Sequence, residues 1–395
     1  MSATSVPIAE IRTPGRALLA RLDMPLVLAV LALLMLGLIM VASASMPLAD
    51  QNFNDPLRFF RRQTLYALLG LGLGAMVLRT PLARIQQLST VFLVGAFALL
   101  LVVLIPGIGK EVNGSARWID LVVIRVQVSE PARLGLLIYL ASFLVRRQLE
   151  VRDRVLGVGK VAVLLAAAGF LLHEEPDLGA AVVLGFSAMT MLWVAGAPLR
   201  YFAVLVTAAV GVVYLLILML PYRMARLTGF MDPWADPFGN GFQLTQSLMA
   251  IGSGHWFGLG LGSSVVKMFY LPEAHTDFLF AILAEELGLV GSLTVIALYA
   301  VVFWRSMRIA DAAARSGRWF GAYLAVGLGV WIVGQAFINI GVNMGMLPTK
   351  GLTLPLMSYG GSSLLVVCVL VALILRVGIE NADPPPQTRV RERGS

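Results

Sequence analysis

Charged residues are scarce in this chain. They make up 13% of its 395 residues, against roughly 25% in soluble domains, while hydrophobic residues make up 58%. This composition excludes an ordinary water-soluble domain and predicts an integral membrane protein. The formal net charge of +8 could suggest a nucleic-acid partner. Because membrane proteins carry excess Lys and Arg in their cytosolic loops, we expect a membrane and no nucleic acid.

Several other features are missing. The single cysteine, Cys368, lies in an apolar run, so neither a disulfide framework nor a cysteine metal site is possible. The three histidines lie too far apart in sequence to indicate a zinc site. The phosphate-loop pattern GxxxxGK[ST] and the dinucleotide pattern GxGxxG are both absent. Residues 1–23 are polar and basic and have no cleavage site, which predicts a cytosolic tail and not a signal peptide.

Long apolar stretches, in contrast, recur along the whole chain. Ten of them approach the roughly 17–25 residues that a helix needs to cross a membrane. They are 25–43, 64–77, 88–105, 131–145, 156–172, 178–195, 201–220, 277–303, 321–342 and 362–379. No run of short alternating strands is evident. We therefore predict an all-α bundle of ten transmembrane helices, within a domain over 24–380, and not a β-barrel.

The basic residues of the short loops fall on one face if there are ten spans. They are Arg12, Arg16, Arg21, Arg79, Arg84, Arg146, Arg147, Arg152, Arg154, Lys160, Arg200, Arg305, Arg308, Arg315, Arg318, Arg389, Arg391 and Arg393. The positive-inside rule places this face, with both termini and a disordered tail over 381–395, in the cytosol. Arg58, Arg61 and Arg62 lie on the opposite face, where they indicate either a bound anion or a helix-end anchor.

The longest polar excursion, about 221–276, separates the seventh and eighth predicted spans. A loop of this length is usually functional or disordered, and this one holds too many aromatic and aliphatic residues for disorder. It contains Lys267 and five glycines between 252 and 262, whose backbone could approach a phosphate closely. We therefore expect the chemistry of the protein in this outer loop.

The loop ends in a dense polar cluster made of Glu273, His275, Thr276 and Asp277. A single carboxylate at a helix start is often only a cap. Glu285 and Glu286, however, follow inside the same apolar segment, with Glu285 about 12 Å deeper at the rise of a helix. Ionisable groups at that depth normally face a cavity or a partner, and the surroundings could raise a carboxylate pKa towards that of a general base. A proton-coupled transporter would use the same residues.

Two further sets of polar residues have open interpretations. Arg117 and Arg125 flank Trp118 in an outer loop, in what reads as a short interfacial segment, and Arg133 enters the fourth span. Arginine suits bidentate phosphate binding, but it also reaches for lipid headgroups. Polar residues recur every fourth position along the ninth span and so form one stripe on its surface. This stripe could make contacts between helices or line a cavity. It consists of Gln335, Asn339 and Asn343.

Six motifs resemble one known family. In chain order they are GKEVNGSARWIDL, QVSEPARL, EEPDLGA, FMDPWADPFGNGFQLTQSLMAIGSG, LPEAHTDFLFAILAEELG and LPTKGLTLPLMSYGGSS. They span 109–363 and resemble the SEDS family (shape, elongation, division and sporulation). LPEAHTDF and PTKGLTLP favour its division branch over its elongation branch. The chain departs from the family at Val128, where proline is commoner, and at Arg133, where lysine is frequent.

The resemblance implies a peptidoglycan glycosyltransferase that polymerises lipid II on the outer face of the bacterial cytoplasmic (inner) membrane, at the division septum. The implied partners are a class B penicillin-binding transpeptidase of the divisome and its activating division proteins. No organic cofactor is implied. Asp277 matches the aspartate of the family's HTDF motif, and Lys350 is the lysine of its PTKG stretch. Arg117 and Arg125 match basic positions of the family's second outer loop.

Asp277 is then the candidate catalytic base, with Arg117, Arg125 and Lys267 as candidates for the diphosphate of the substrate. A divalent cation, Mg²⁺ or Mn²⁺, could share that work, with Asp277 or Glu286 as ligand. The other candidate substrate-binding residues are Glu130, Arg133, Glu273, His275, Thr276, Glu286 and Lys350. Two alternatives remain at this point: a lipid II flippase, and a divisome scaffold without chemistry.

Overall fold

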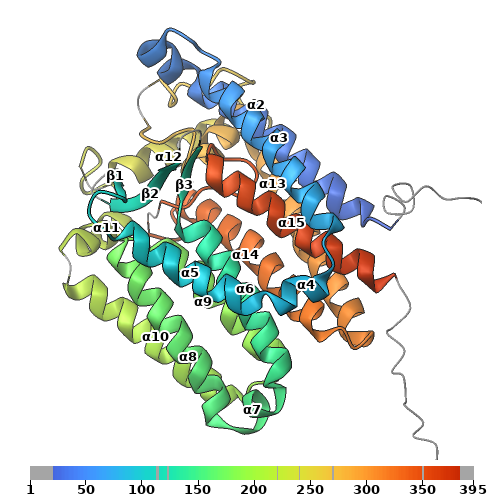
Figure 1. The fold of residues 1–395 in the computed structure, drawn as a ribbon. Coiled ribbons are helices and arrows are strands. Elements are labelled where there is room, and N and C mark those ends of the chain that lie inside the picture. The colour runs from blue at the N-terminus through green and yellow to red at the C-terminus, as the bar shows by residue number, and fades with distance from the viewer. Residues whose placement is uncertain are drawn as a thin grey trace, which may run out of the picture.

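The computed structural model describes residues 21–112, 115–121, 124–219, 221–239, 241–268, 271–348 and 351–382 (Figure 1). Helices dominate this part of the chain. They are α2 (Met24–Phe53), α3 (Arg58–Arg79), α4 (Leu82–Gln87), α5 (Ser89–Val103), α6 (Ser129–Arg146), α7 (Gln148–Asp153), α8 (Val155–Glu174), α9 (Leu178–Val194), α10 (Leu199–Met219), α11 (Pro221–Met231), α12 (Phe242–Ser253), α13 (Leu279–Arg315), α14 (Trp319–Asn343) and α15 (Gly361–Asn381). The prediction of a helical membrane protein is confirmed.

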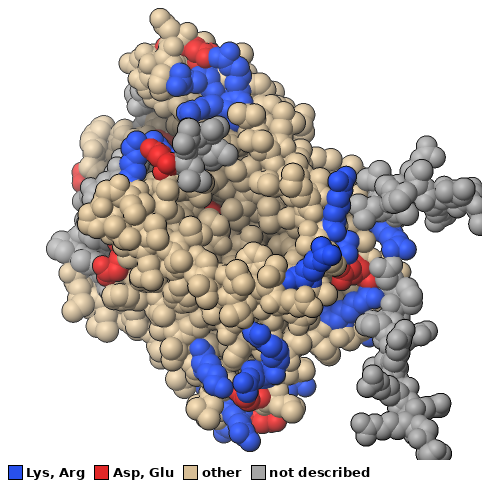
Figure 2. All heavy atoms as spheres, viewed as in Figure 1, with Lys and Arg blue, Asp and Glu red and all other residues tan. Residues whose placement is uncertain are grey.

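Each of the ten predicted apolar segments overlaps one of these helices. The matching helices are α2, α3, α5, α6, α8, α9, α10, α13, α14 and α15. Within the described ranges, α2, α8, α13, α14 and α15 are long and apolar enough to cross a membrane, whereas α5, α9 and the part Leu199–Val212 of α10 are apolar but shorter. In Figure 2 the charged atoms gather towards the ends of the helices, with a surface of other residues between. That all ten helices cross the membrane stays a prediction.

The first two helices extend beyond their apolar segments. The side chain of Asp23 accepts a hydrogen bond from Leu26 N (3.1 Å) and so caps α2, which continues to Phe53 instead of ending near 43. α3 begins at Arg58, six residues before the predicted start. The two form a hairpin along one side of the molecule (Figure 1). Most of the stretch between the predicted segments 25–43 and 64–77 is therefore helical, because helical hydrogen bonding can continue through polar residues past the membrane boundary.

The outer loop before α6 folds as a small antiparallel sheet, which the prediction of an all-α bundle did not include. Its strands are β1 (Lys110–Val112), β2 (Ser115–Leu121) and β3 (Ile124–Gln127), in the order β1-β2-β3. Trp118, expected in an interfacial segment, lies in β2 opposite Gln127. The sequence carries the signals: β3 alternates apolar and polar residues, and an Asn-Gly pair, the strongest short hairpin signal, separates β1 from β2.

The long excursion between α10 and α13 contains two helices, α11 and α12, followed by a segment that lies against α13. Leu259 N donates to Glu285 O (2.9 Å), and Leu289 N donates to His255 O (2.9 Å). These bonds flank a break in α13 at Gly288, whose φ is +67°. A Cβ on Gly258 (φ +78°) would lie 2.1 Å from Glu286 O. This glycine lets two backbones touch, so the interpretation of a phosphate loop is not supported there.

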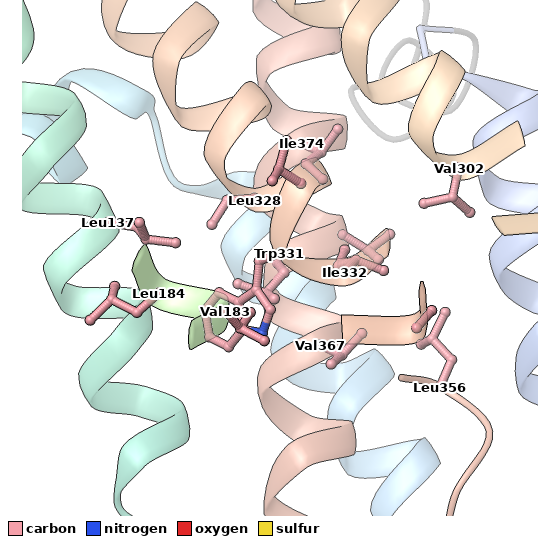
Figure 3. Packing of buried hydrophobic residues seen from close by; sticks show 14 of the residues in the cluster. Leu137, Val183, Leu184, Val302, Leu328, Trp331, Ile332, Leu356, Val367 and Ile374 are labelled. Atoms are coloured by element: carbon pink, nitrogen blue, oxygen red, sulfur yellow. The ribbon is translucent and has the colours of Figure 1, made fainter. Parts of the chain in front are cut away.

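Helix α14 forms the centre of the described fold. Its Trp331 is 1% exposed, and in Figure 3 Leu328, Trp331 and Ile332 lie among side chains from the neighbouring helices. Those side chains include Leu137 of α6, Val183 and Leu184 of α9, Val302 of α13, and Val367 and Ile374 of α15. The polar stripe of α14 continues from this apolar core towards its C-terminal end. The core therefore fixes the helix that carries the stripe.

Candidate active site

Asp277 lies just before α13 and is held through its main chain by α14. Its carbonyl oxygen accepts hydrogen bonds from Asn339 Nδ2 (2.8 Å) and Asn343 Nδ2 (3.0 Å). The Oδ1 atom of Asn343 accepts one from Ala281 N (3.1 Å) in the first turn of α13. Both asparagines are buried, whereas Asp277 is only partly buried. The structure thus favours the interhelical interpretation of these two stripe residues, and they fix the position of Asp277.

The carboxylate of Asp277 lies beside the segment that follows Lys350. A Cβ added to Gly351 would lie 3.2 Å from Asp277 Oδ2. The next carbonyl, that of Leu352, accepts a hydrogen bond from Asn339 Nδ2 (2.6 Å). Asn339 therefore joins the start of α13 to this segment. Lys350 itself lies outside the described residues.

His275 packs in an aromatic group beside Asp277. Its ring centroid lies 4.9 Å from that of Phe59 on α3 and 5.6 Å from that of Tyr359. Its carbonyl oxygen accepts a hydrogen bond from Tyr359 N (2.9 Å). Burial lowers the pKa of His275, so the ring is neutral at pH 7. In this arrangement His275 positions the chain next to Asp277.

Glu273 and Thr276 interact with each other at the surface of the loop. Thr276 Oγ1 donates to Glu273 Oε2 (2.7 Å), and Glu273 has a left-handed backbone (φ +57°). Glu273 is exposed, unlike His275. Within the predicted cluster, Glu273 and Thr276 therefore pair near the surface, whereas the imidazole of His275 is buried.

Arg133 and Glu130 form a buried ion pair at the start of α6. Arg133 Nη2 lies 2.6 Å from Glu130 Oε1, and the two side chains are 1% and 4% exposed. The guanidinium carbon lies 4.5 Å from the ring centroid of Trp331, and Gln335 Oε1 accepts from Trp331 Nε1 (3.0 Å). Gln335 Nε2 donates to the carbonyl of Thr353 (2.9 Å). This network positions the segment beside Asp277, and direct contact of Arg133 with substrate stays a prediction.

Arg117 reaches from β2 to the turn between α8 and α9. Its Nε donates to the carbonyl of Glu175 (2.8 Å), and its Nη2 donates to that of Pro176. The arginine thus ties the sheet to this turn. Two of its five N–H groups are used in doing so.

Asp177 lies in the EEPDLGA motif and is a polar centre between three elements. It caps α9, since its Oδ1 accepts from Ala180 N (3.1 Å). Its Oδ2 also accepts from Ser129 Oγ (2.8 Å) and Gln127 Nε2 (3.0 Å). Because it joins β3, α6 and α9, it positions the outer sheet, and the signal for it was the EEPDLGA motif.

Arg125 and Lys110 are accessible cations of the sheet. The Nε of Arg125 and the Nζ of Lys110 each lie 2.8 Å from the carboxylate of Asp120, and all three side chains are about half exposed. The two cations lower the pKa of Asp120, which stays ionised. One carboxylate balances two cations here, so the group keeps a net positive charge for an anion.

Lys267 and Glu286 pair with each other inside the protein. Lys267 Nζ lies 2.7 Å from Glu286 Oε1, and both side chains are almost fully buried. Ser43 of α2 joins them, because its Oγ accepts from Lys267 (2.9 Å) and donates to Glu286 (2.6 Å). Glu285 accepts from Val265 N (2.9 Å). The two carboxylates therefore hold the 264–267 segment against α13 and α2, and a substrate contact stays a prediction.

The two carboxylates named as possible metal ligands lie apart. Asp277 and Glu286 are nine residues apart, which is about 13 Å at the rise of a helix. Among the residues that the structure describes, no three His, Cys, Asp or Glu side chains are grouped so that they could hold a metal ion. These two residues therefore do not share one ion in this conformation, and a divalent cation stays a prediction.

Glu175 is a buried carboxyl group outside the helices. Its exposed fraction is 0%, and neither carboxyl oxygen has a hydrogen-bond partner in the described part of the chain. Burial, together with the nearby charge of Asp177, raises its pKa to about 8, against the opposing effect of Arg117. The side chain is therefore mostly protonated at pH 7.

We expect this proton to make stability depend on pH. Between pH 4.5 and about 8 the folded chain keeps a proton that the unfolded chain releases. Stability should fall as pH rises through this window, by up to about 1.4 kcal/mol per pH unit, and level off above it. Glu175→Gln should remove this dependence and raise the melting temperature most at pH 8–9. Melting curves from pH 5 to 9 measure this, with Glu174→Gln as the neighbouring control, and parallel curves for wild type and Glu175→Gln would contradict it.

Comparisons with known proteins identify the family. The family model of the FtsW, RodA and SpoVE proteins, described as "Cell cycle protein", matches residues 24–383. The chain belongs to this family. It is the family that the six motifs resemble, and the match covers every helix and strand that carries the candidate site.

Individual relatives cover almost the whole chain. The "Probable peptidoglycan glycosyltransferase FtsW" of Thioalkalivibrio sulfidiphilus (strain HL-EbGR7) is 54% identical over 387 residues, which is 97% of each chain. The protein of the same name from Halorhodospira halophila (strain DSM 244 / SL1) is 49% identical over 395 residues, the full length of both. The similarity is therefore not confined to the motifs.

Solved structures show the same fold. One, described as "Structural coordination of polymerization and crosslinking by a peptidoglycan synthase complex", has a chain with a TM-score of 0.76 and 30% identity. The match covers 92% of this chain and 99% of that one. The rod shape determining protein RodA of Thermus thermophilus matches with a TM-score of 0.67 and 29% identity, over 92% of this chain and 98% of its own.

Proposed function

We propose that this chain is a peptidoglycan glycosyltransferase that polymerises lipid II into glycan strands during septal cell-wall synthesis. The printed names of relatives near 50% identity support the activity. The observation in the structure that carries the proposal is Asp277, a partly buried carboxylate whose main chain two buried asparagines hold at the start of α13. It is a fixed and reachable proton acceptor beside the family's PTKG stretch.

In the proposed reaction the 4-hydroxyl oxygen of one lipid-linked disaccharide bonds to the anomeric carbon of the growing chain. The bond from that carbon to the polyprenyl diphosphate breaks, and its electron pair leaves with the diphosphate. The hydroxyl proton passes to the carboxylate of Asp277. Since the donor is α-linked and the polymer β-linked, one inverting displacement suffices, and no covalent intermediate on the protein is needed.

The other carboxylates near α13 suit this role less well. Glu285 and Glu286 are 1% and 0% exposed. Glu130 is buried against Arg133. A base must reach the proton that it removes, and Asp277 is more exposed than any of these three.

The leaving diphosphate needs positive charge in a poorly hydrated site. Arg125 and Lys110 supply accessible charge with one shared carboxylate between them. Arg117 and Arg133 are tied to carbonyl groups and to Glu130, so we assign them the positioning of the sheet and of the 351–360 segment. We also propose that Lys350 binds the diphosphate, because it is the lysine of the family's PTKG stretch.

We expect Arg125→Ala to raise the KM for lipid II about tenfold and to change kcat much less. A hydrogen bond to a charged group contributes about 1.5–3 kcal/mol, and Arg125 would bind the diphosphate before and during the reaction. Initial rates over a range of lipid II concentrations measure the effect. Arg315→Ala, which removes an exposed ion pair with Asp311, is the control. An unchanged KM would count against a diphosphate role for Arg125.

The proposed setting is the bacterial inner membrane at the septum, with both termini cytosolic and the site on the periplasmic side. The distribution of Lys and Arg supports this orientation. We also propose a class B penicillin-binding transpeptidase and its activators as partners. The related chain from a structure described as a peptidoglycan synthase complex supports a partner of this kind.

A gel assay tests the proposed function. Purified lipid II is incubated with the chain and its transpeptidase partner, and penicillin prevents crosslinking. Glycan polymer that depends on the chain is the expected result. An absence of polymer, together with movement of lipid II across vesicle membranes by the same preparation, would overturn the proposal in favour of the flippase.

A further inference from the structure

A groove opens between α5, α6 and α8, away from the candidate active site. Its volume is about 350 Å³, and its walls are mostly apolar and aromatic. Phe97 comes from α5, Tyr139 and Phe143 come from α6, and Lys160, Leu164 and Ala167 come from α8. α5 packs along α6, whereas α5 and α8 have little contact. The gap between these two helices leaves space that no side chain of the described residues fills.

One end of the groove is basic. Lys160 lines it, and the guanidinium carbon of Arg146 lies 5.6 Å from the ring centroid of Tyr139, another lining residue. Both cations are exposed. Between 146 and 160 the chain has five basic residues and two acidic ones. Figure 2 shows this group of blue atoms around a few red ones at the end of the molecule where Figure 1 places α7. The end of the groove therefore has a net positive charge.

Apolar side chains lie exposed beside these cations. Leu149 of α7 is 76% exposed, and Val155 and Leu156 at the start of α8 are 58% and 68% exposed. Exposed leucines next to arginines are typical of a surface at the boundary between headgroups and acyl chains. The groove thus runs from this boundary along the acyl region of one leaflet.

We propose that the groove binds an anionic phospholipid, with one acyl chain along Phe97 and Leu164 and the phosphate between Lys160 and Arg146. Basic pockets between transmembrane helices are a known way to hold acidic headgroups. The apolar walls explain why a chain enters the groove, and the cations explain why the lipid is acidic. The proposal does not depend on the glycosyltransferase reaction.

Glu150 offsets part of the positive charge at this end of the groove. Its Oε2 lies 2.8 Å from Lys160 Nζ, and its Oε1 pairs with Arg147. The hydrogen bonds from Lys160 and Arg147 lower the pKa of Glu150, so it stays ionised. A lipid phosphate therefore competes with Glu150 for Lys160. Removing the charge of Glu150 should strengthen lipid binding, whereas removing the charge of Lys160 should weaken it.

Native mass spectrometry of the full chain tests this. The detergent-solubilised protein is given equal amounts of phosphatidylglycerol and phosphatidylcholine with the same acyl chains. Wild type should retain phosphatidylglycerol in preference to phosphatidylcholine. Lys160→Gln and Arg146→Gln should each lower that preference about fivefold, and Glu150→Gln should raise it. Ala167→Trp, which fills the groove, should lower retention of both lipids.

Arg315→Gln is the matched control, because it removes an exposed cation that is paired with an acidic residue elsewhere on the chain. It should leave lipid retention unchanged. Equal retention of both lipids by wild type would overturn the proposal. So would an equal loss in Arg315→Gln and Lys160→Gln, which would show attraction by overall charge, or retention that Ala167→Trp leaves unchanged.

Discussion

Asp277→Asn is expected to lower the rate of lipid II polymerisation by about 10²–10⁴-fold without unfolding the protein. Asparagine has nearly the shape of aspartate but cannot take up the hydroxyl proton. The main-chain carbonyl at this position would still accept hydrogen bonds from Asn339 and Asn343, so the start of α13 should keep its place. The gel assay described above, with the transpeptidase partner and penicillin present, measures the rate.

The control for this experiment is Asp311→Asn. Asp311 lies near the other end of α13 and pairs with Arg315 at the surface. This variant should polymerise at the wild-type rate. A folded Asp277→Asn protein with a wild-type rate would refute the assignment of Asp277 as base. Asp277→Glu, which keeps the carboxylate but moves it, should retain more activity than Asp277→Asn.

The second large effect is expected from Lys267→Met, which leaves Glu286 buried without its cation. Breaking a buried ion pair by removing one partner costs about 3–5 kcal/mol, because the remaining charge stays desolvated. Ser43 Oγ and Ser264 N would be the remaining hydrogen-bond donors to Glu286 among the described residues. The melting temperature in detergent should therefore fall strongly, and the 264–267 segment should lose one of its attachments to α13 while keeping the hydrogen bond from Val265 N to Glu285.

A second substitution separates the cost of an unpaired charge from a role in binding substrate. Lys267→Met combined with Glu286→Gln should recover most of the stability, since neither position of the pair then leaves a buried charge without its partner, and should recover activity with it. Lys160→Met, which breaks an exposed pair with Glu150, should cost less than about 1 kcal/mol. A stable double variant with a raised KM for lipid II would instead show that Lys267 or Glu286 binds substrate.

The class of fold could be predicted because lipid imposes a simple rule on sequence. Inside a bilayer no water is available to the backbone polar groups, and a helix satisfies all of them within its own segment, so a long apolar segment favours a helix. The ten apolar segments all overlap helices for this reason. The ends of α2 and α3 were wrong by up to ten residues, since hydrogen bonding within a helix does not stop where apolar residues stop.

The position of Asp277 was also visible in sequence, because a polar cluster directly precedes an apolar helix. The partners of the charged residues were not. Arg133 is a candidate substrate-binding residue from the sequence, and in the fold its charge is opposed by Glu130 and its guanidinium lies over Trp331, 198 residues further along the chain. Side chains at such separations meet only when helices pack, and periodicity within one helix does not say which helix will face it.

The sequence by itself determined the membrane class, the helical architecture and the family, because composition, segment length and motif order are properties of the chain alone. Tertiary structure decided which charged side chains are buried in pairs and which stay partly exposed. Lys267 and Glu286 neutralise each other across Ser43, which is 243 residues from Glu286, while Asp277 stays partly exposed. Burial and distance set the energy of a charge, and both arise only when segments far apart in sequence come together.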